Sequence, residues 1–135
     1  MRRAVIATDL SDMPAAYRAA RRRISVAQRA GATRHLLPAY YHLSDLYANQ
    51  MQPLPALQAL LQVQALADCR LQPNHRLNTS IAADLGLQYA TLGDSARARR
   101  DERRARAFLV RDTARSRFYV CGTLGLLNWR LRDWP

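Results

Sequence analysis

Residues 85–105 read LGLQYATLGDSARARRDERRA, and this stretch sets the organisation of the chain. Gly93 suits a turn, because glycine adopts the left-handed backbone that ends helices, and Asp94 or Ser95 can cap the helix that follows. Gly86 has no side chain and therefore lets a second helix approach closely. We expect two short helices folded back on each other and joined at Gly93.

The same spacing occurs earlier in the chain, where Leu43-Ser44-x-x-Tyr47 is followed by Ala56 and Val63. Each of these residues has a counterpart 42 positions later, namely Leu85, Gly86, Tyr89, Ala98 and Ala105. A fixed offset shared by five positions indicates an internal repeat, which is typical of stacked helical units.

The pattern resembles the tetratricopeptide (TPR) repeat, with an aromatic residue, Leu-Gly and Tyr on a first helix and Ala, a large apolar residue and Ala on a second. In the first copy Tyr40 and Leu60 supply the aromatic and the large apolar residue. The second copy has Ala82 and Glu102 there, Asp68 replaces the closing proline of the first, and the period exceeds the usual ~34. The resemblance implies an all-α fold, a right-handed TPR-like α-solenoid of about two and a half stacked antiparallel helical hairpins. An ordinary helical bundle with this spacing by chance is the alternative.

A chain of 135 residues fits a single domain, residues 1–135. Pro14 suits the first turn of a helix capped by Ser11 or Asp12, Gly31 ends that helix, and Thr33 caps the next. For residues 1–10 we expect either a short strand or a frayed turn. We expect helices over about 11–30, 34–49, 54–70, 76–92 and 95–113, and a capping helix within 115–135 that is interrupted at Gly122 and Gly125.

The net charge of +11 comes entirely from arginine, because the chain contains no lysine. Mutational bias in a GC-rich genome produces such a composition as readily as selection for binding does. The distribution is more informative, with eight arginines in residues 1–34, nine in 95–117 and only two in 35–94. Two basic segments therefore flank a nearly uncharged middle.

Apolar runs in this chain are too short for a membrane span or for the core of a signal peptide. We therefore expect a bacterial cytoplasmic protein without a membrane partner. Cys69 and Cys121 lie in different segments and form no CxxC motif, so we expect both to be reduced and packed.

The sequence indicates no enzyme, no metal site and no cofactor. Asp101 and Glu102 are the only adjacent carboxylates, and the arginines around them favour a solvated ion-pair network. His35 and His42 are seven residues apart on one helix, too far to bind one metal ion, and His75 lies in a loop next to Pro73. Neither a GxSxG elbow nor a glycine-rich phosphate loop occurs.

A concave groove lined by the first helix of each hairpin is the functional surface that the resemblance implies. The residues of these helices that hairpin packing does not use are predicted to bind a peptide, and they are Tyr41, Asp45, Asn49, Leu87 and Thr91. The predicted function is a non-catalytic protein-interaction module that binds a peptide or a helix. The alternative interpretation of these positions is that they only face solvent.

Two further functions stay open. Residues 97–106 carry arginine pairs that suit phosphate contacts, so Arg99, Arg100, Arg103 and Arg104 are candidate nucleic-acid-binding residues. Residues 125–130, GLLNWR, resemble the GLxNRR that opens GGDEF (diguanylate cyclase) domains, which implies a sensor region of a nucleotide-signalling protein. The incomplete repeats at both ends suggest a fragment of a longer array or self-association through its open ends.

Overall fold

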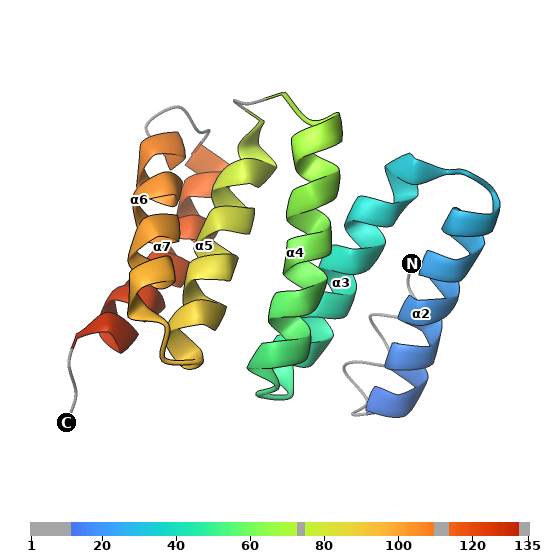
Figure 1. The fold of residues 1–135 in the computed structure, drawn as a ribbon, viewed down its shortest axis with the longest axis horizontal. Helices are drawn as coiled ribbons and strands as arrows, with labels where there is room; N and C mark the ends of the chain where they lie inside the picture. The colour runs from blue at the N-terminus through green and yellow to red at the C-terminus, as the bar shows by residue number, and fades with distance from the viewer. Residues whose placement is uncertain (1–11, 73–74, 110–113, 133–135) are drawn as a thin grey trace. The chain divides into compact units, whose positions relative to one another are not determined.

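The computed structural model describes residues 12–72, 75–109 and 114–132 (Figure 1). These residues form helices and no strand, so the predicted all-α class is confirmed for the described part of the chain. The prediction for residues 1–10 lies outside it. The elements are α2 (Met13–Arg29), the 3₁₀ helix η1 (Thr33–His35), α3 (Leu36–Asn49), α4 (Pro53–Arg70), α5 (Arg76–Thr91), α6 (Ser95–Leu109) and α7 (Ala114–Leu131).

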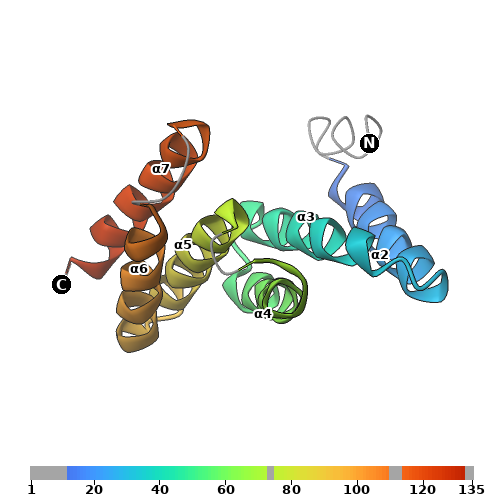
Figure 2. The ribbon, with the colours of Figure 1, turned by 90° about the horizontal axis from the view of Figure 1, so that it is seen from above.

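The chain divides into two compact units, Met1–Leu66 and Ala67–Pro135. In the first unit α2 packs against α3, and α4 runs beside α3 (Figures 1 and 2). Small side chains on the inner face of α2 allow the two helix axes to approach closely. The core between α2 and α3 consists of Ala16, Ala20, Ile24, Ala27, Leu36, Ala39, Leu43 and Leu46.

Helix α2 begins and ends near the residues that were predicted to bound it. The Asp12 carboxylate accepts a hydrogen bond from the Ala15 backbone N–H at 3.1 Å, which confirms Asp12 as the cap. Gly31 has a φ of +62°, a conformation that favours glycine and ends the helix. Thr33 is not the cap of α3, because it begins the 3₁₀ helix η1 and the residue at the cap position of α3 is His35.

The second unit packs α6 and α7 against α5 (Figure 2). Gly93, with a φ of +85°, forms the turn between α5 and α6, and Asp94 accepts a hydrogen bond from the Arg97 backbone N–H. Gly86 marks the close approach: a Cβ placed there would lie 2.8 Å from Leu127 Cδ2 and 3.3 Å from the Ala98 carbonyl oxygen. The glycine therefore lets α5 contact α6 and α7 at the same level.

The predicted interruption of the last helix at Gly122 and Gly125 is wrong, because α7 runs through both glycines. A single glycine costs a helix only about 1 kcal/mol, and burial of an apolar stripe outweighs that cost. The stripe is Leu124, Leu127 and Leu131, all less than 9% exposed. Trp134, which the sequence placed with it, lies outside the described residues.

Positions separated by the 42-residue offset have similar burial in the two units. Tyr47 is half-buried and Tyr89 buried. The other paired positions are buried in both copies: Leu43 and Leu85, Ser44 and Gly86, Ala56 and Ala98, and Val63 and Ala105. Within the described residues, no helix combines the length and the apolar character that crossing a bilayer requires.

Candidate functional site

A pocket of about 370 Å³ opens on the first unit between α3 and α4. Tyr40, Leu43 and Tyr47 line one side, because their spacing of three and four residues places them on one face of α3. The other side has the same helical spacing on α4 and consists of Pro55, Gln58, Ala59 and Gln62. The lining thus combines aromatic, aliphatic and amide groups and contains no acidic residue.

The hydroxyl groups of both pocket tyrosines accept hydrogen bonds from side chains of α2. Gln28 Nε2 donates a hydrogen bond to the Tyr40 hydroxyl at 3.3 Å, and Arg21 Nη2 donates one to the Tyr47 hydroxyl at 3.1 Å. The Tyr17 ring lies against that of Tyr47 with 5.0 Å between centroids, and its own hydroxyl donates to the Leu46 carbonyl. Burial raises the pKa of Tyr17. These contacts fix the aromatic side of the pocket.

The amide side chains of Gln58 and Gln62 are exposed and make no hydrogen bond to any described residue. They lie one turn apart on α4, so both reach the same pocket. A glutamine amide offers two N–H donors and one carbonyl acceptor, which is the complement of a peptide backbone. The pocket therefore combines two amide groups that make no hydrogen bond to the described residues with an aromatic surface that α2 holds in place.

The predicted peptide-binding residues lie elsewhere. Tyr41, Asp45 and Asn49 share a different face of α3 from the pocket; Tyr41 is half-buried and the other two are exposed. Leu87 and Thr91 lie one turn apart on α5 in the other compact unit, and the Thr91 hydroxyl donates to the Leu87 carbonyl at 2.9 Å. The intrahelical bond occupies the only donor of that hydroxyl.

Sequence reasoning missed the pocket because it assigned Tyr40, Leu43 and Tyr47 to hairpin packing and did not consider α4 as part of a site. One signal was present in the sequence. Gln58 and Gln62 are polar residues at a spacing of four within the largely apolar first half of this helix, and that spacing predicts a polar stripe on one face.

The Asp45 carboxyl has a pKa well above its ordinary value. Although its residue surface is exposed, partial burial of the carboxyl raises its pKa from 3.8 to about 6. No described residue forms a salt bridge with it, so no positive charge offsets the loss of water.

We expect Asp45→Asn to change the pH dependence of stability. The pKa of Asp45 is higher in the folded than in the unfolded chain. Its contribution to the free energy of unfolding is therefore fully present below about pH 4 and is lost as the pH rises through about 6. The free energy of unfolding of the wild type, relative to Asp45→Asn, should therefore fall by about 1 kcal/mol between these limits, a figure discounted for the exposure of the group. Urea unfolding at both pH values measures this difference, and a constant difference would contradict the prediction.

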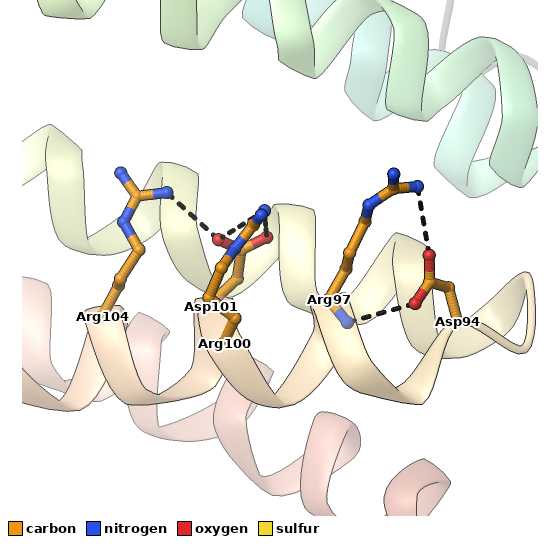
Figure 3. Close-up of polar contacts among 5 residues, drawn as sticks. All are labelled: Asp94, Arg97, Arg100, Asp101 and Arg104. Atoms are coloured by element: carbon orange, nitrogen blue, oxygen red, sulfur yellow. Dashed lines mark hydrogen bonds and ion pairs between the residues drawn. The ribbon is translucent and has the colours of Figure 1, made fainter.

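The sequence predicted a solvated ion-pair network around Asp101 and Glu102 of helix α6. The structure shows that this network is not fully solvated. Asp101 is completely buried, at 0% exposure. Its carboxylate lies 3.3 Å from Arg100 Nη2 and 3.1 Å from Arg104 Nη1 (Figure 3). The prediction failed because the Asp101 Cβ lies 3.6 Å from the position of a Gly86 Cβ, so the residue faces α5 and not solvent.

Two further ion pairs involve residues of α6. Arg97 pairs with Asp94 at 3.2 Å (Figure 3). Its guanidinium also lies over the Tyr89 ring, 5.7 Å from the ring centroid. Arg106 pairs with Glu102 at 3.0 Å. The hydrogen bond and charge of Asp101 raise the pKa of Arg100.

Of the four candidate nucleic-acid-binding arginines, Arg100 and Arg104 are engaged by Asp101. Arg99 donates to the Leu131 carbonyl at 3.3 Å, which ties α6 to the end of α7. Arg103 is exposed and has no partner among the described residues. Neutralisation within the helix thus reduces the charge that α6 offers to phosphate.

The predicted packing of the cysteines is wrong, because Cys69 and Cys121 are both exposed free thiols. Burial, with a smaller effect from the positive charge of Arg23, lowers the pKa of His42, and its buried Nε2 has no hydrogen-bond partner in the described structure. Within the ranges that the structure describes, no three His, Cys, Asp or Glu side chains form a group that could hold a metal ion.

Comparisons with known proteins identify no relative. The chain matches no protein-family model, no curated protein and no solved structure.

Proposed function

We propose that this chain is a non-catalytic protein-interaction module that binds a peptide or a short helix in the α3–α4 pocket. The observation that carries the proposal is the combination of a tyrosine surface fixed by α2 with two uncommitted glutamine amides. We further propose that α3–α4 and α5–α6 act as TPR-like hairpins, a family in which hairpin surfaces receive extended or helical peptides.

The size of the pocket suits a small anchor, meaning an apolar side chain of the bound peptide. Its volume of about 370 Å³ lies at the low end of the range of ligand pockets, so it accommodates one or two apolar side chains. Tyr40 and Tyr47 provide large, rigid, amphipathic contact area, and Gln58 and Gln62 provide hydrogen bonds to a backbone. In this mechanism the anchor supplies most of the affinity and the amides set the direction of the peptide.

A selection from a displayed random-peptide library, followed by fluorescence anisotropy on the selected peptides, tests the proposal. Gln58→Ala/Gln62→Ala should weaken binding about tenfold, because two hydrogen bonds of about 0.5–1.5 kcal/mol each are lost. Tyr41→Ala/Asn49→Ala removes side chains from another face of the same helix and is the matched control. It should leave the dissociation constant within about twofold of wild type.

Two outcomes would contradict the proposal. Peptides that depend on Tyr41 and Asn49 but not on the glutamines would assign binding to the other face of α3. Failure to select any peptide, together with salt-sensitive binding of labelled single-stranded DNA that Arg99→Gln/Arg103→Gln abolishes, would assign the function to the arginines of α6.

A further inference from the structure

We infer that the peptide bound in the α3–α4 pocket is acidic, and that Arg21 of α2 pairs with one of its carboxylates at the edge of the pocket. The inference rests on the proposed function and adds to it the charge of the partner. It follows from the position of Arg21, from the charge of the surrounding surface and from the composition of the pocket.

Arg21 lies beside the pocket because its Nη2 donates to the hydroxyl of Tyr47, a lining residue, at 3.1 Å. That bond is its only hydrogen bond within the described residues, and no described carboxylate pairs with it. A guanidinium has five N–H donors in a planar fork, so four remain for a ligand. The Tyr47 hydroxyl thus places an exposed, uncompensated cation next to the pocket.

The surrounding surface has the same sign. Helix α2 contains five arginines and no acidic residue: Arg18, Arg21, Arg22, Arg23 and Arg29. The described part of the first unit has only two acids, Asp12 and Asp45. Asp12 caps the start of α2, and Asp45, two residues before Tyr47, lies on another face of α3. Neither offsets the charge at the pocket.

The composition of the pocket favours a peptide over a bare polyanion. Leu43, Pro55 and Ala59 provide apolar contact for an aliphatic or aromatic anchor, and the two glutamines match a backbone. Arg21 stands at one edge of this lining, so a carboxylate next to the anchor can form a bidentate, charge-assisted pair with it. The ligand class is an amphipathic segment with an apolar anchor flanked by Asp or Glu.

The probe is the same displayed random-peptide library, selected in parallel on wild type, Arg21→Gln and Arg22→Gln. The last variant is the matched control, since Arg22 is an exposed neighbour that faces another direction and carries the same charge. We expect Asp and Glu to be enriched in the peptides selected by wild type and by Arg22→Gln. The enrichment should disappear for Arg21→Gln.

Anisotropy with the best wild-type peptide quantifies the contact. Arg21→Gln should weaken binding about tenfold, the size of one charge-assisted pair, whereas Arg22→Gln should change it by less than about twofold. Arg21→Lys keeps the charge but loses the planar fork and should give an intermediate affinity. Tyr47→Phe removes the hydroxyl that positions Arg21 and should weaken the acidic peptide more than its Gln/Asn analogue.

The outcomes separate this inference from the proposed function. If wild type selects peptides without acidic enrichment, and these depend on Gln58 and Gln62, the pocket binds peptides and the inference is wrong. If Arg21→Gln and Arg22→Gln weaken binding equally, the charge acts diffusely and the assignment to Arg21 is wrong. If no peptide is selected, both fail.

Discussion

Gly86→Val is expected to reduce the free energy of unfolding by about 3 kcal/mol, because the added side chain overpacks the contact between α5, α6 and α7. A Cβ at residue 86 would lie 2.8 Å from Leu127 Cδ2 and 3.3 Å from the Ala98 carbonyl oxygen. Leu127 is fully buried, so its side chain has little room to rotate, and the second neighbour is backbone, which moves only if a helix shifts. Urea unfolding followed by circular dichroism measures the loss.

The matched control is Gly122→Val on α7. Both glycines lie inside helices, but nothing lies within 4 Å of a Cβ at residue 122. This substitution should be neutral or slightly stabilising, because valine has the higher helix propensity. Leu127→Ala in the Gly86→Val background should recover part of the loss by removing the nearer obstacle. Equal stability of the two valine variants would show that α5 does not depend on this close approach.

Arg100→Gln/Arg104→Gln is expected to cost about 3 kcal/mol, more than Asp101→Asn. Removing both guanidiniums leaves the fully buried Asp101 carboxylate without a described ion-pair partner. Removing the carboxylate leaves two cations whose side chains are 51% and 39% exposed and stay hydrated, so the amide variant should lose only about 1 kcal/mol. The order of these two losses is the prediction.

Arg97→Gln/Arg103→Gln removes the same charge from the same helix and is the control. Asp94, the partner of Arg97, has 35% of its side chain exposed and keeps its hydration, so this double substitution should cost no more than about 1 kcal/mol. Equal losses for the two arginine pairs would mean that total charge, and not the burial of Asp101, governs the stability of α6.

Much of the helical organisation could be predicted from the sequence, because its signals are local. Asp12 and Gly31 bound α2, and Gly93 forms the predicted turn. The close approach at Gly86 was also predicted, although only the structure shows that α7 as well as α6 takes part in it. Conformations at positive φ and side-chain caps depend on a few neighbouring residues, so one sequence is sufficient to predict them.

The features that sequence reasoning missed depend on contacts between helices. Asp101 is surrounded by arginines in the sequence and looks solvated, yet it is buried because its side of α6 faces Gly86. Tyr47 fits a packing position, yet its hydroxyl and ring link α2 to the wall of a pocket. Cys69 and Cys121 are apolar enough to suggest packing, but their helices turn them to solvent. No local pattern determines such contacts.

The boundary between the two compact units falls between Leu66 and Ala67, inside the uninterrupted helix α4 and not at a turn. Because proteases cleave extended segments and not helix interiors, limited trypsin digestion should not separate the units at this boundary. The nearest arginines are the exposed Arg70 and Arg76, at the end of α4 and the start of α5. A fragment released there would carry the whole of α4, on both sides of the boundary between the units.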